Sequence, residues 1–357
     1  MLRSFVRISL PADPTAIALG MALVLAGAFL PTEGSRAAAQ EPGLKLAIGD
    51  LGLGIGDVRR LDGVRLNFRD LELDRVRGLN VTIWEPHEAS RGHVVGIALG
   101  LPLTGAHRLT GVGAGVGLSV DEDLTGAGVG LLGIGAGGRI RGVFLGGMGA
   151  GAGGDVEGIA LGGLGVGTGG TVRGVVAGGL GVGAGENLNG LAVGGLGVGV
   201  GGTFAGVAAG GLGMGVGGDA RGILMGGLGV GTGGSLTGIA LGGLGVGVGE
   251  DMHGLALGGA GVGVGGAMRG VIVAGGGAGL TNGRGLVIAP GYFRVEEAGS
   301  FHGVSVSAFN DIRGSQRGLA IGLINIANEL HGLQVGLVNI ARNKDSFSVL
   351  PLFNYHP

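Results

Sequence analysis

Bulky and small side chains alternate along most of this chain. In the segment from Ile159 to Leu161, and again from Leu164 to Val166, the alternation has a period of two, which is the pattern of a β-strand. A glycine pair lies between the two segments, and the parity of the bulky residues changes there. A polar stretch from Thr168 to Arg173 follows. Glycine pairs and polar stretches are typical of corners. We therefore expect repeats of two short strands, joined by a glycine corner and a polar corner.

The pattern recurs with a fixed period of sixteen residues. Each repeat opens on a glycine, and we call these residues the opening glycines. In the regular part they are Gly142, Gly158, Gly174, Gly190, Gly206, Gly222, Gly238, Gly254 and Gly270. Looser repeats open at Gly63, Gly78, Gly96, Gly111, Gly126, Gly285, Gly303, Gly318 and Gly332, which makes about eighteen in all. A fixed period predicts a repeat architecture in which each unit contacts its neighbours.

Two all-β architectures fit this repeat. In a parallel β-solenoid each repeat is one coil, and residue i lies beside residue i+16. In an antiparallel meander each repeat is one strand plus a turn, and the strands could close into an outer-membrane β-barrel. The change of parity in every regular unit favours the solenoid, because a barrel strand keeps one lipid-facing parity. The equally short breaks favour it too, since such barrels usually have long loops on one side.

Charges spaced by sixteen residues also favour the solenoid. Arg139 and Arg141 precede Asp155 and Glu157 by sixteen, and Arg173 follows Glu157 by sixteen. Opposite charges would therefore be adjacent in a parallel stack. We predict an all-β, repetitive parallel β-solenoid of about 16-residue coils, with the antiparallel meander or outer-membrane β-barrel as the alternative. The residues expected to point inward are Ile159, Leu161, Leu164, Val166 and Val172, with their counterparts Ile239, Leu241, Leu244, Val246 and Met252.

The N-terminus has the pattern of a secretory signal peptide. Arg3 and Arg7 precede an apolar run, and Ala37-Ala38-Ala39 supplies small residues for cleavage. The predicted organisation is a signal peptide over 1–39 and irregular repeats with an N-terminal cap over 40–125. Regular glycine-rich repeats follow over 126–284, and shorter units with a C-terminal cap over 285–357.

Composition narrows the function. The chain has 94 glycines, a formal net charge of −2 and no cysteine. The absence of cysteine excludes disulfides and thiolate metal sites. Without a basic excess, nucleic acid is not expected as a partner. No block of like charges along the sequence indicates a membrane surface.

The last repeats differ from the central ones. Gly318 onward reads GLAIGLINIANELH and Gly332 onward reads GLQVGLVNIARNKD, while residues 349–355 read VLPLFNY. Over about residues 303–355 the chain resembles a bacterial surface-repeat family with GLQxGLxNIA-type repeats of about fourteen residues. The resemblance implies an exported or surface-associated protein and carries no catalytic or ligand residues. The central block departs from the family by placing glycine, such as Gly165 and Gly181, where the family has asparagine, here Asn325 and Asn339.

Local motifs do not indicate a chemical site. Fragments of the dinucleotide fingerprint GxGxxG recur every sixteen residues without a helical pattern. The repeat also imitates a calcium-binding β-roll, but glycine replaces the ligating aspartate. Asp155, Asp219 and Asp251 are therefore expected to be solvated corner residues.

Two acidic clusters are also expected to be exposed. The cluster Glu85, His87, Glu88 and His93 has residue types that bind zinc, but its spacing fits no named site, so we expect a loop. The cluster Asp121, Glu122 and Asp123 is expected to be a solvated turn. We predict no catalytic, cofactor-binding or metal-binding residues and no cofactor.

These patterns indicate an exported structural or surface repeat protein with a scaffold or adhesion role and no catalysis. The expected location is the cell surface, the outer membrane or the medium. The partner is unknown; the cell envelope or other surface proteins are candidates, and membrane association stays open. The main alternative is an outer-membrane β-barrel pore, and a third is a hydrolase that uses the irregular segment around residues 80–110.

Overall fold

The protein is described by a computed structural model that covers residues 43–69, 73–84 and 92–357. Within these ranges every regular element is a β-strand, and the strands form about 17 turns of parallel β-solenoid. The chain divides into two compact units, Met1–Gly137 with Phe144–Gly151, and Gly138–Val143 with Ala152–Pro357. The predicted signal peptide, residues 1–39, lies outside the described residues.

The first unit starts with a hairpin and continues with parallel turns. Strands β1 and β2 pair antiparallel, whereas β2 and β3 and each following pair through β7 are parallel. Its strands are β1 (Leu44–Ile48), β2 (Leu51–Ile55), β3 (Arg60–Arg69), β4 (Arg75–Trp84), β5 (His93–Ala106), β6 (Arg108–Val120) and β7 (Leu124–Ala136). Strands β8 (Ile140–Gly146) and β9 (Gly149–Ala152) have residues in both units.

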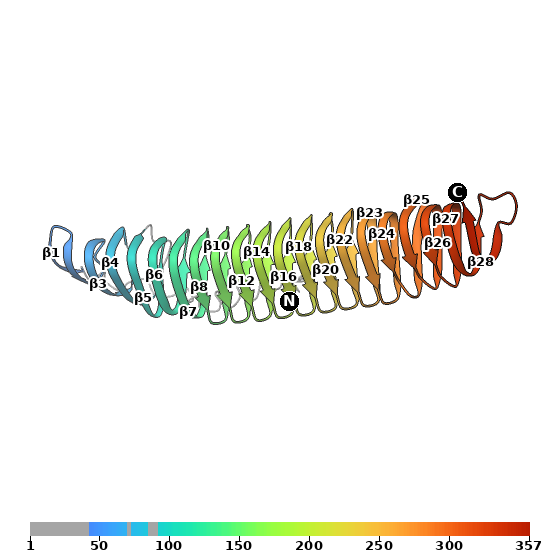
Figure 1. The fold of residues 1–357 in the computed structure, drawn as a ribbon. Coiled ribbons are helices and arrows are strands. Elements are labelled where there is room, and N and C mark those ends of the chain that lie inside the picture. Colours follow the sequence, from blue (N-terminus) through green and yellow to red (C-terminus); the bar gives the residue numbers. More distant parts are fainter. Residues whose placement is uncertain (1–42, 70–72, 85–91) are drawn as a thin grey trace, which may run out of the picture. The chain divides into compact units, whose positions relative to one another are not determined.

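The second unit alternates a seven-residue strand with a four-residue strand in each regular turn (Figure 1). The longer strands are β10 (Val156–Gly162), β12 (Val172–Gly178), β14 (Leu188–Gly194), β16 (Phe204–Gly210), β18 (Ala220–Gly226), β20 (Leu236–Gly242) and β22 (Met252–Gly258). The shorter ones are β11 (Gly165–Thr168), β13 (Gly181–Ala184), β15 (Gly197–Val200), β17 (Gly213–Val216), β19 (Gly229–Thr232) and β21 (Gly245–Val248).

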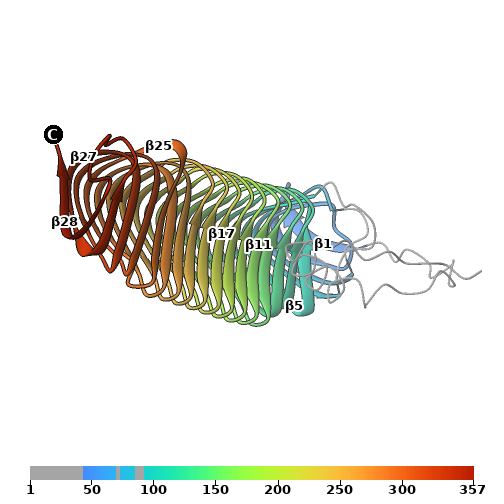
Figure 2. The same cartoon turned by 90° about the vertical axis from the view of Figure 1, so that its right-hand side faces the viewer.

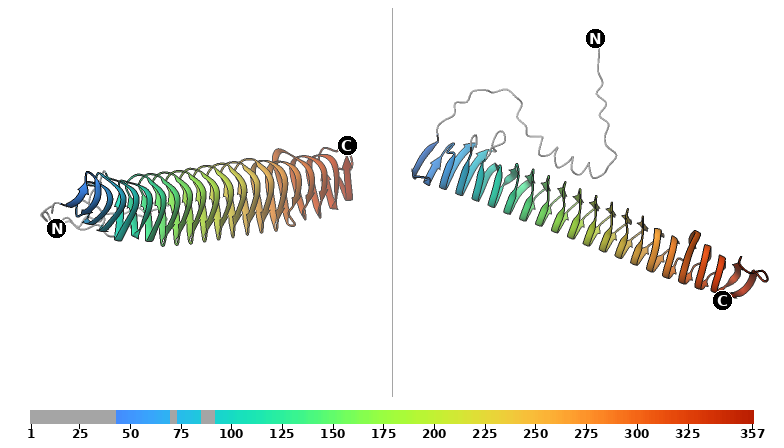
Figure 3. Two further views of the ribbon diagram at one scale, coloured as in Figure 1. Left: turned by 60° about the vertical axis from the view of Figure 1, so that its left-hand side comes forward. Right: turned by 90° about the horizontal axis from the view of Figure 1, so that it is seen from above.

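Five long strands and a cap complete this unit. They are β23 (Gly261–Ala274), β24 (Gly277–Ile288), β25 (Tyr292–Val306), β26 (Phe309–Ile321), β27 (Ile324–Ala341) and β28 (Val349–His356). Strand β28 pairs antiparallel with β27 and so caps the last parallel turn. In Figure 2 the turns of this unit are nested loops around one axis, and the right-hand view of Figure 3 shows them following one another in chain order.

The register of the second unit confirms the solenoid. Strand β10 pairs parallel with β12, so that Val156 lies beside Val172, and β12 pairs in the same way with β14. Each regular residue therefore has its counterpart sixteen positions later as its neighbour. The antiparallel meander is wrong, because consecutive repeats run in the same direction.

The opening glycines form a column whose backbone conformation requires glycine. All eighteen of those identified in the sequence have positive φ, from 115° at Gly318 to 150° at Gly63 and Gly332. At Gly174, where φ is 134°, an added Cβ would lie 2.1 Å from the carbonyl oxygen of Gly158. Both the conformation and the close approach of the preceding turn exclude a side chain.

Six of the ten residues expected to point inward point outward instead. Val166 and Val172 are buried, as are Val246 and Met252. The others face outward, fully or half exposed: Ile159, Leu161, Leu164, Ile239, Leu241 and Leu244. The buried residue of the first strand is the small one, Ala160. The inward positions keep one parity through the turn, so the proposed change of parity at the glycine pair does not occur.

The narrowness of the coil explains this correction. At the glycine corner the two strands of one turn approach so closely that a Cβ on Gly178 would lie 2.1 Å from the oxygen of Gly181. In the regular turns the inward position directly beside this corner is therefore glycine. Alternation along the strand then places the residues one and three positions before it, such as Leu161 and Ile159, outward. The solenoid prediction was right, but the parity argument that supported it was not.

Large and small residues compensate within the core of two successive turns. Phe204 and Ala208 are inward neighbours on β16, and in the next turn the order is reversed, with Ala220 and Leu224 on β18. All four side chains are buried. This complementarity keeps the interior filled while the backbone of successive turns stays in register.

The C-terminal turns have a polar core. Asn310, Asn325, Asn339 and Asn354 are fully buried. The Nδ2 of Asn310 donates to Oδ1 of Asn325 at 2.7 Å, and Nδ2 of Asn325 donates to Oδ1 of Asn339 at 2.7 Å. We call these four residues the asparagine ladder; such ladders satisfy side-chain amides from one strand to the next.

The ladder corrects the assignment of its counterparts in the central block. One inward column runs through successive turns, in which Val262 pairs with Ala278, Ala278 with Phe293, Phe293 with Asn310 and Asn310 with Asn325. The ladder therefore corresponds to Val166 and Val182, not to Gly165 and Gly181. The C-terminal turns have one residue fewer at the glycine corner than the regular turns. Counting from the opening glycine therefore aligned Asn325 with Gly165 when its structural counterpart is Val166.

Candidate functional surface

The second unit exposes two columns of apolar side chains. They come from the residues one and three positions after each opening glycine from Gly158 to Gly332, and we call this surface the apolar face. None of its members is buried, and Ile159 and Val193 are 39% and 43% exposed. The members are Ile159, Leu161, Val175, Ala177, Leu191, Val193, Val207, Ala209, Ile223, Met225, Ile239, Leu241, Leu255, Leu257, Val271, Val273, Leu286, Ile288, Val304, Val306, Leu319, Ile321, Leu333 and Val335.

The apolar face ends in two aromatic residues on the cap strand. Tyr355 pairs with Leu333 and Phe353 pairs with Val335, so the aromatic rings continue the two columns. They are 58% and 62% exposed. The first unit has the same outward pattern on its own strands, as at Val64, Ile97 and Val112.

Exposed leucines line the glycine corner at the far edge of the apolar face. In the regular turns they are Leu164, Leu180, Leu196, Leu212, Leu228 and Leu244, and in the C-terminal turns Leu323 and Leu337. No charged residue occurs from one to eleven positions after any opening glycine from Gly142 to Gly254. Each regular turn is therefore apolar at its glycine corner and carries its charges at the opposite, polar corner.

The polar corner is organised by side-chain oxygens that bind the next turn. Oδ1 of Asp155 accepts the backbone N–H of Thr171 at 2.9 Å, and Asp219 and Asp251 accept the corresponding N–H groups of Ser235 and Ala267. This hydrogen bond, followed by one from Arg173, holds the pKa of Asp155 below its usual value. The three aspartates are corner residues, as expected, with a structural contact to the following turn.

The predicted pairs of Arg141 and Arg173 with Glu157 form at the same corner. Arg141 lies 2.7 Å from Glu157, and Arg173 lies 3.0 Å from Asp155 and 3.4 Å from Glu157. In the first unit, the cluster Asp121, Glu122 and Asp123 forms the turn between β6 and β7. Its Glu122 contacts His107 and Arg108.

A column of basic residues borders the apolar face in the later turns. It comprises the residues that directly precede the opening glycines, and adjacent members are paired in parallel register. We call it the basic column: His253, Arg269, Arg284, His302, Arg317 and His331. None of its three arginines forms an ion pair with a described residue, in contrast to Arg141 and Arg173.

The interior of the basic column has no acidic neighbours in the adjacent outward column. The residues two positions earlier are Ala267, Asn282, Ser300 and Ser315, and acids appear only at the ends, as Asp251 and Glu329. Burial, followed by the charges of Arg317 and Arg284, lowers the pKa of His302. Arg269 and Arg284 lie side by side in adjacent strands, where like charges repel, so this pair is an electrostatic cost to the isolated protein.

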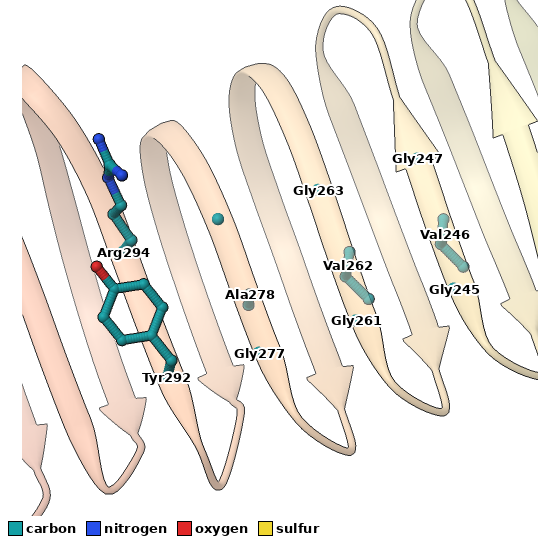
Figure 4. A pocket seen from close by; sticks show the side chains of 11 residues that line it. Gly245, Val246, Gly247, Gly261, Val262, Gly263, Gly277, Ala278, Tyr292 and Arg294 are labelled. Carbon is teal, nitrogen blue, oxygen red and sulfur yellow. The ribbon is translucent and has the colours of Figure 1, made fainter.

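The short strands present a face almost without side chains. The outward glycines at the start of β21, β23 and β24, such as Gly245, Gly261 and Gly277, form a trough that ends at Tyr292 and Arg294 (Figure 4). Tyr292 donates a hydrogen bond to Asp311 at 2.9 Å and stacks on Phe309, with ring centroids 5.5 Å apart. Burial, followed by this hydrogen bond, raises the pKa of Tyr292. The trough is open and apolar, and its only polar side chains stand at one end.

The other candidate residues give no chemical site. Glu85, His87 and Glu88 lie outside the described residues, and His93 begins strand β5, with its ring stacked 6.4 Å from that of His107. Within the described ranges, no group of three or more His, Cys, Asp or Glu side chains is arranged to hold a metal ion. None of the described residues belongs to a helix long and apolar enough to cross a membrane.

Comparison with family models, curated proteins and solved structures gives no match to this chain. The fold itself therefore defines the class, a glycine-rich parallel β-solenoid with one apolar and one polar corner. The basic column was missed in the sequence because its members are spaced by 14 to 18 residues. The column could have been found by comparing the residues that directly precede the opening glycines, because those glycines were already identified in the sequence.

Proposed function

We propose that this chain is an exported structural repeat protein that acts as a scaffold or adhesive surface at the cell envelope and performs no catalysis. The observation that carries the proposal is the apolar face, in which 24 successive outward positions of the second unit are apolar. Outward positions of a free protein tolerate polar residues at little cost, so a column kept apolar over many turns supports a contact surface.

The rest of the structure supports a mechanical role. Each regular turn repeats the same backbone hydrogen bonds, for example Leu180 N–H to Leu164 oxygen and Leu196 N–H to Leu180 oxygen, both at 2.6 Å. A stack of equivalent turns presents one chemistry at a regular spacing of about 4.8 Å. A scaffold uses such repetition, because it offers many equal contacts to one extended partner.

Export is tested by following the N-terminus in a bacterial host. We expect N-terminal sequencing of the tagged protein to find Gln40 as the first residue, and surface protease to reach the mature chain in intact cells. Ala39→Arg should block cleavage, because the site needs a small residue at that position. Ala38→Gln is the matched control and should be cleaved, since the middle position of Ala-x-Ala accepts other residues. Retention of the uncleaved chain in the cytoplasm would contradict the proposal.

A further inference from the structure

We propose that the apolar face and the basic column together bind the surface of a bilayer that contains anionic lipids. This inference deepens the proposed function by naming its partner. It rests on three features of the second unit: the extent of the apolar face, the uncompensated charge beside it, and the aromatic end on β28.

The apolar face is too large to be incidental. Its twelve turns correspond to about 58 Å at the spacing of β-strands, and two outward columns give roughly 600 Å². The largest apolar patch of a soluble monomer is itself about 300–600 Å² and is often functional. The leucines at the glycine corner enlarge this surface in the regular turns from Leu164 to Leu244 and again at Leu323 and Leu337. Apolar area of this kind binds strongly to acyl chains at the boundary of a bilayer.

The position of the basic column selects an anionic surface. Each of its side chains lies two residues from the first apolar column on the same strand, a separation of about 6.6 Å. The residue between them is an opening glycine, so no side chain separates the two columns. Arginine guanidinium groups bind phosphate oxygens through paired hydrogen bonds. A lipid whose phosphate meets Arg284 or Arg317 would place its acyl chains over the apolar columns.

Among the described residues, no acidic side chain forms an ion pair with Arg269, Arg284 or Arg317. Arg141 and Arg173 occupy equivalent positions in earlier turns, but both contact acidic side chains. The neighbours of Arg269, Arg284 and Arg317 are other basic residues of the column. An external anion relieves this repulsion. Tyr355 and Phe353 at the end of the face are residue types that favour the interface between headgroups and acyl chains.

The test is flotation of the purified full chain with vesicles of phosphatidylcholine alone or with about 30% phosphatidylglycerol. We expect binding to the anionic vesicles that weakens with salt. Arg284→Gln with Arg317→Gln should lower the affinity roughly 30-fold, from the contribution of two arginines near an anionic surface. Arg141→Gln with Arg173→Gln removes the same charge from paired positions and should leave the affinity within about threefold.

A second pair of substitutions tests the apolar face. Leu286→Gln with Val304→Gln should reduce binding to anionic vesicles at least tenfold while leaving the circular dichroism spectrum and melting temperature close to those of the unaltered protein, because both side chains point outward. All variants share the N-terminal apolar segment, so its own affinity for lipid cancels in the comparison.

Three results would overturn the inference. Equal binding by all variants would place the lipid contact elsewhere, and equal binding to neutral and anionic vesicles would remove the role of the basic column. A lipid-independent dimer that Leu286→Gln with Val304→Gln dissociates would assign the face to a second copy of the chain. These outcomes concern purified protein, so they are distinct from failure of export in cells.

Discussion

The regular turns and the C-terminal turns share the same columns but fill them with different chemistry. In the regular turns the inward column at Val166 and Val182 is aliphatic, and the outward positions beside it are glycines. In the C-terminal turns the same inward column is the asparagine ladder, and outward positions carry Tyr292, Phe309 and Ile324. The backbone register is therefore independent of whether the core is dry or hydrogen-bonded.

The comparison shows what each region requires of its sequence. A valine column tolerates neighbours of different size, since Met214 stands in it among valines. The ladder is more demanding, because each amide must meet the next one and a missing member leaves buried polar groups without partners. The regular region depends on repetition, and the C-terminal region depends on particular pairs.

The largest expected effect comes from breaking the repeat in the regular turns. Removing Gly190–Ala205 deletes one whole turn and joins two turns that match, so the protein should fold with a modest loss of stability. Removing only Gly190–Gly197 leaves half a turn and shifts the inward residues of the remainder against their neighbours, so that variant should not fold. Thermal melts and protease resistance compare the two. Equal damage from both deletions would contradict a turn of sixteen residues.

A cavity in the regular core should have the next largest effect. Phe204→Ala removes the bulkiest side chain of its turn and should lower the free energy of unfolding by about 3–5 kcal/mol in chemical denaturation. Adding Ala208→Leu should restore part of that loss, because Ala220 with Leu224 shows that the next turn accepts this reversed arrangement. Ala208→Leu alone is the control and should destabilise by overpacking. No rescue by the double variant would refute the compensation within a turn.

The asparagine ladder should be more sensitive than the valine column. Asn325→Ala leaves the Oδ1 of Asn339 and the carbonyl of Val335 without the amide that now binds them, at a cost of about 2–4 kcal/mol. Val182→Ala, in the same column, removes only apolar atoms and should cost about 1–2 kcal/mol. Asn325→Val is the second control and should not recover stability, since it restores volume but no hydrogen bond. A ladder variant as mild as Val182→Ala would show that the network contributes little.

The polar corner should give a small dependence on pH. The folded-state pKa of Asp155 is lowered from 3.8 by the hydrogen bonds of Thr171 and Arg173. Its contribution is therefore complete above pH 3.8 and is lost as the pH falls below that value through the folded-state pKa. We expect melting temperatures to decline there, by an amount equivalent to less than ~1 kcal/mol because the group is partly solvated. Asp155→Asn should lose that part of the pH dependence and keep a side-chain oxygen as acceptor. Asn187, two turns later, accepts the equivalent N–H of Thr203 with its Oδ1.

Much of this fold follows from the sequence, and the failures have one physical origin. The opening glycines, the two corners and the pairing of Arg141 with Glu157 were all predictable from the period. The facing of the strands was not, because Ile159 and Leu161 look like core residues by hydrophobicity. Their outward position depends on the width of the coil at the glycine corner, and that width is set by contacts such as Gly178 with Gly181.

The candidate surface shows the same limit. Because bulky residues were assigned to the interior, the apolar face could not be anticipated, although every one of its residues was visible in the repeat. The basic column was hidden for a different reason, since charge was sought in continuous blocks of sequence. In the stack Arg269 lies beside Arg284, and His302 lies between Arg284 and Arg317. The register is therefore needed before charge can be interpreted.

The smallest expected effect concerns the outward glycines of the short strands. At Gly215 an added Cβ would meet nothing within 4 Å, and its φ is not positive. Gly215→Ala should therefore stabilise the protein slightly, by about 0.4–1 kcal/mol, because alanine restricts the unfolded chain. Gly222→Ala, at the opening glycine of the next turn, is the control: the φ of Gly222 is 118° and an added Cβ would lie 1.9 Å from the oxygen of Gly206, so the substitution should destabilise strongly. The measurement is the midpoint of denaturant unfolding. Marked destabilisation by Gly215→Ala would show that the bare face is required for folding, whereas the predicted gain would show that folding alone does not account for glycine at this position.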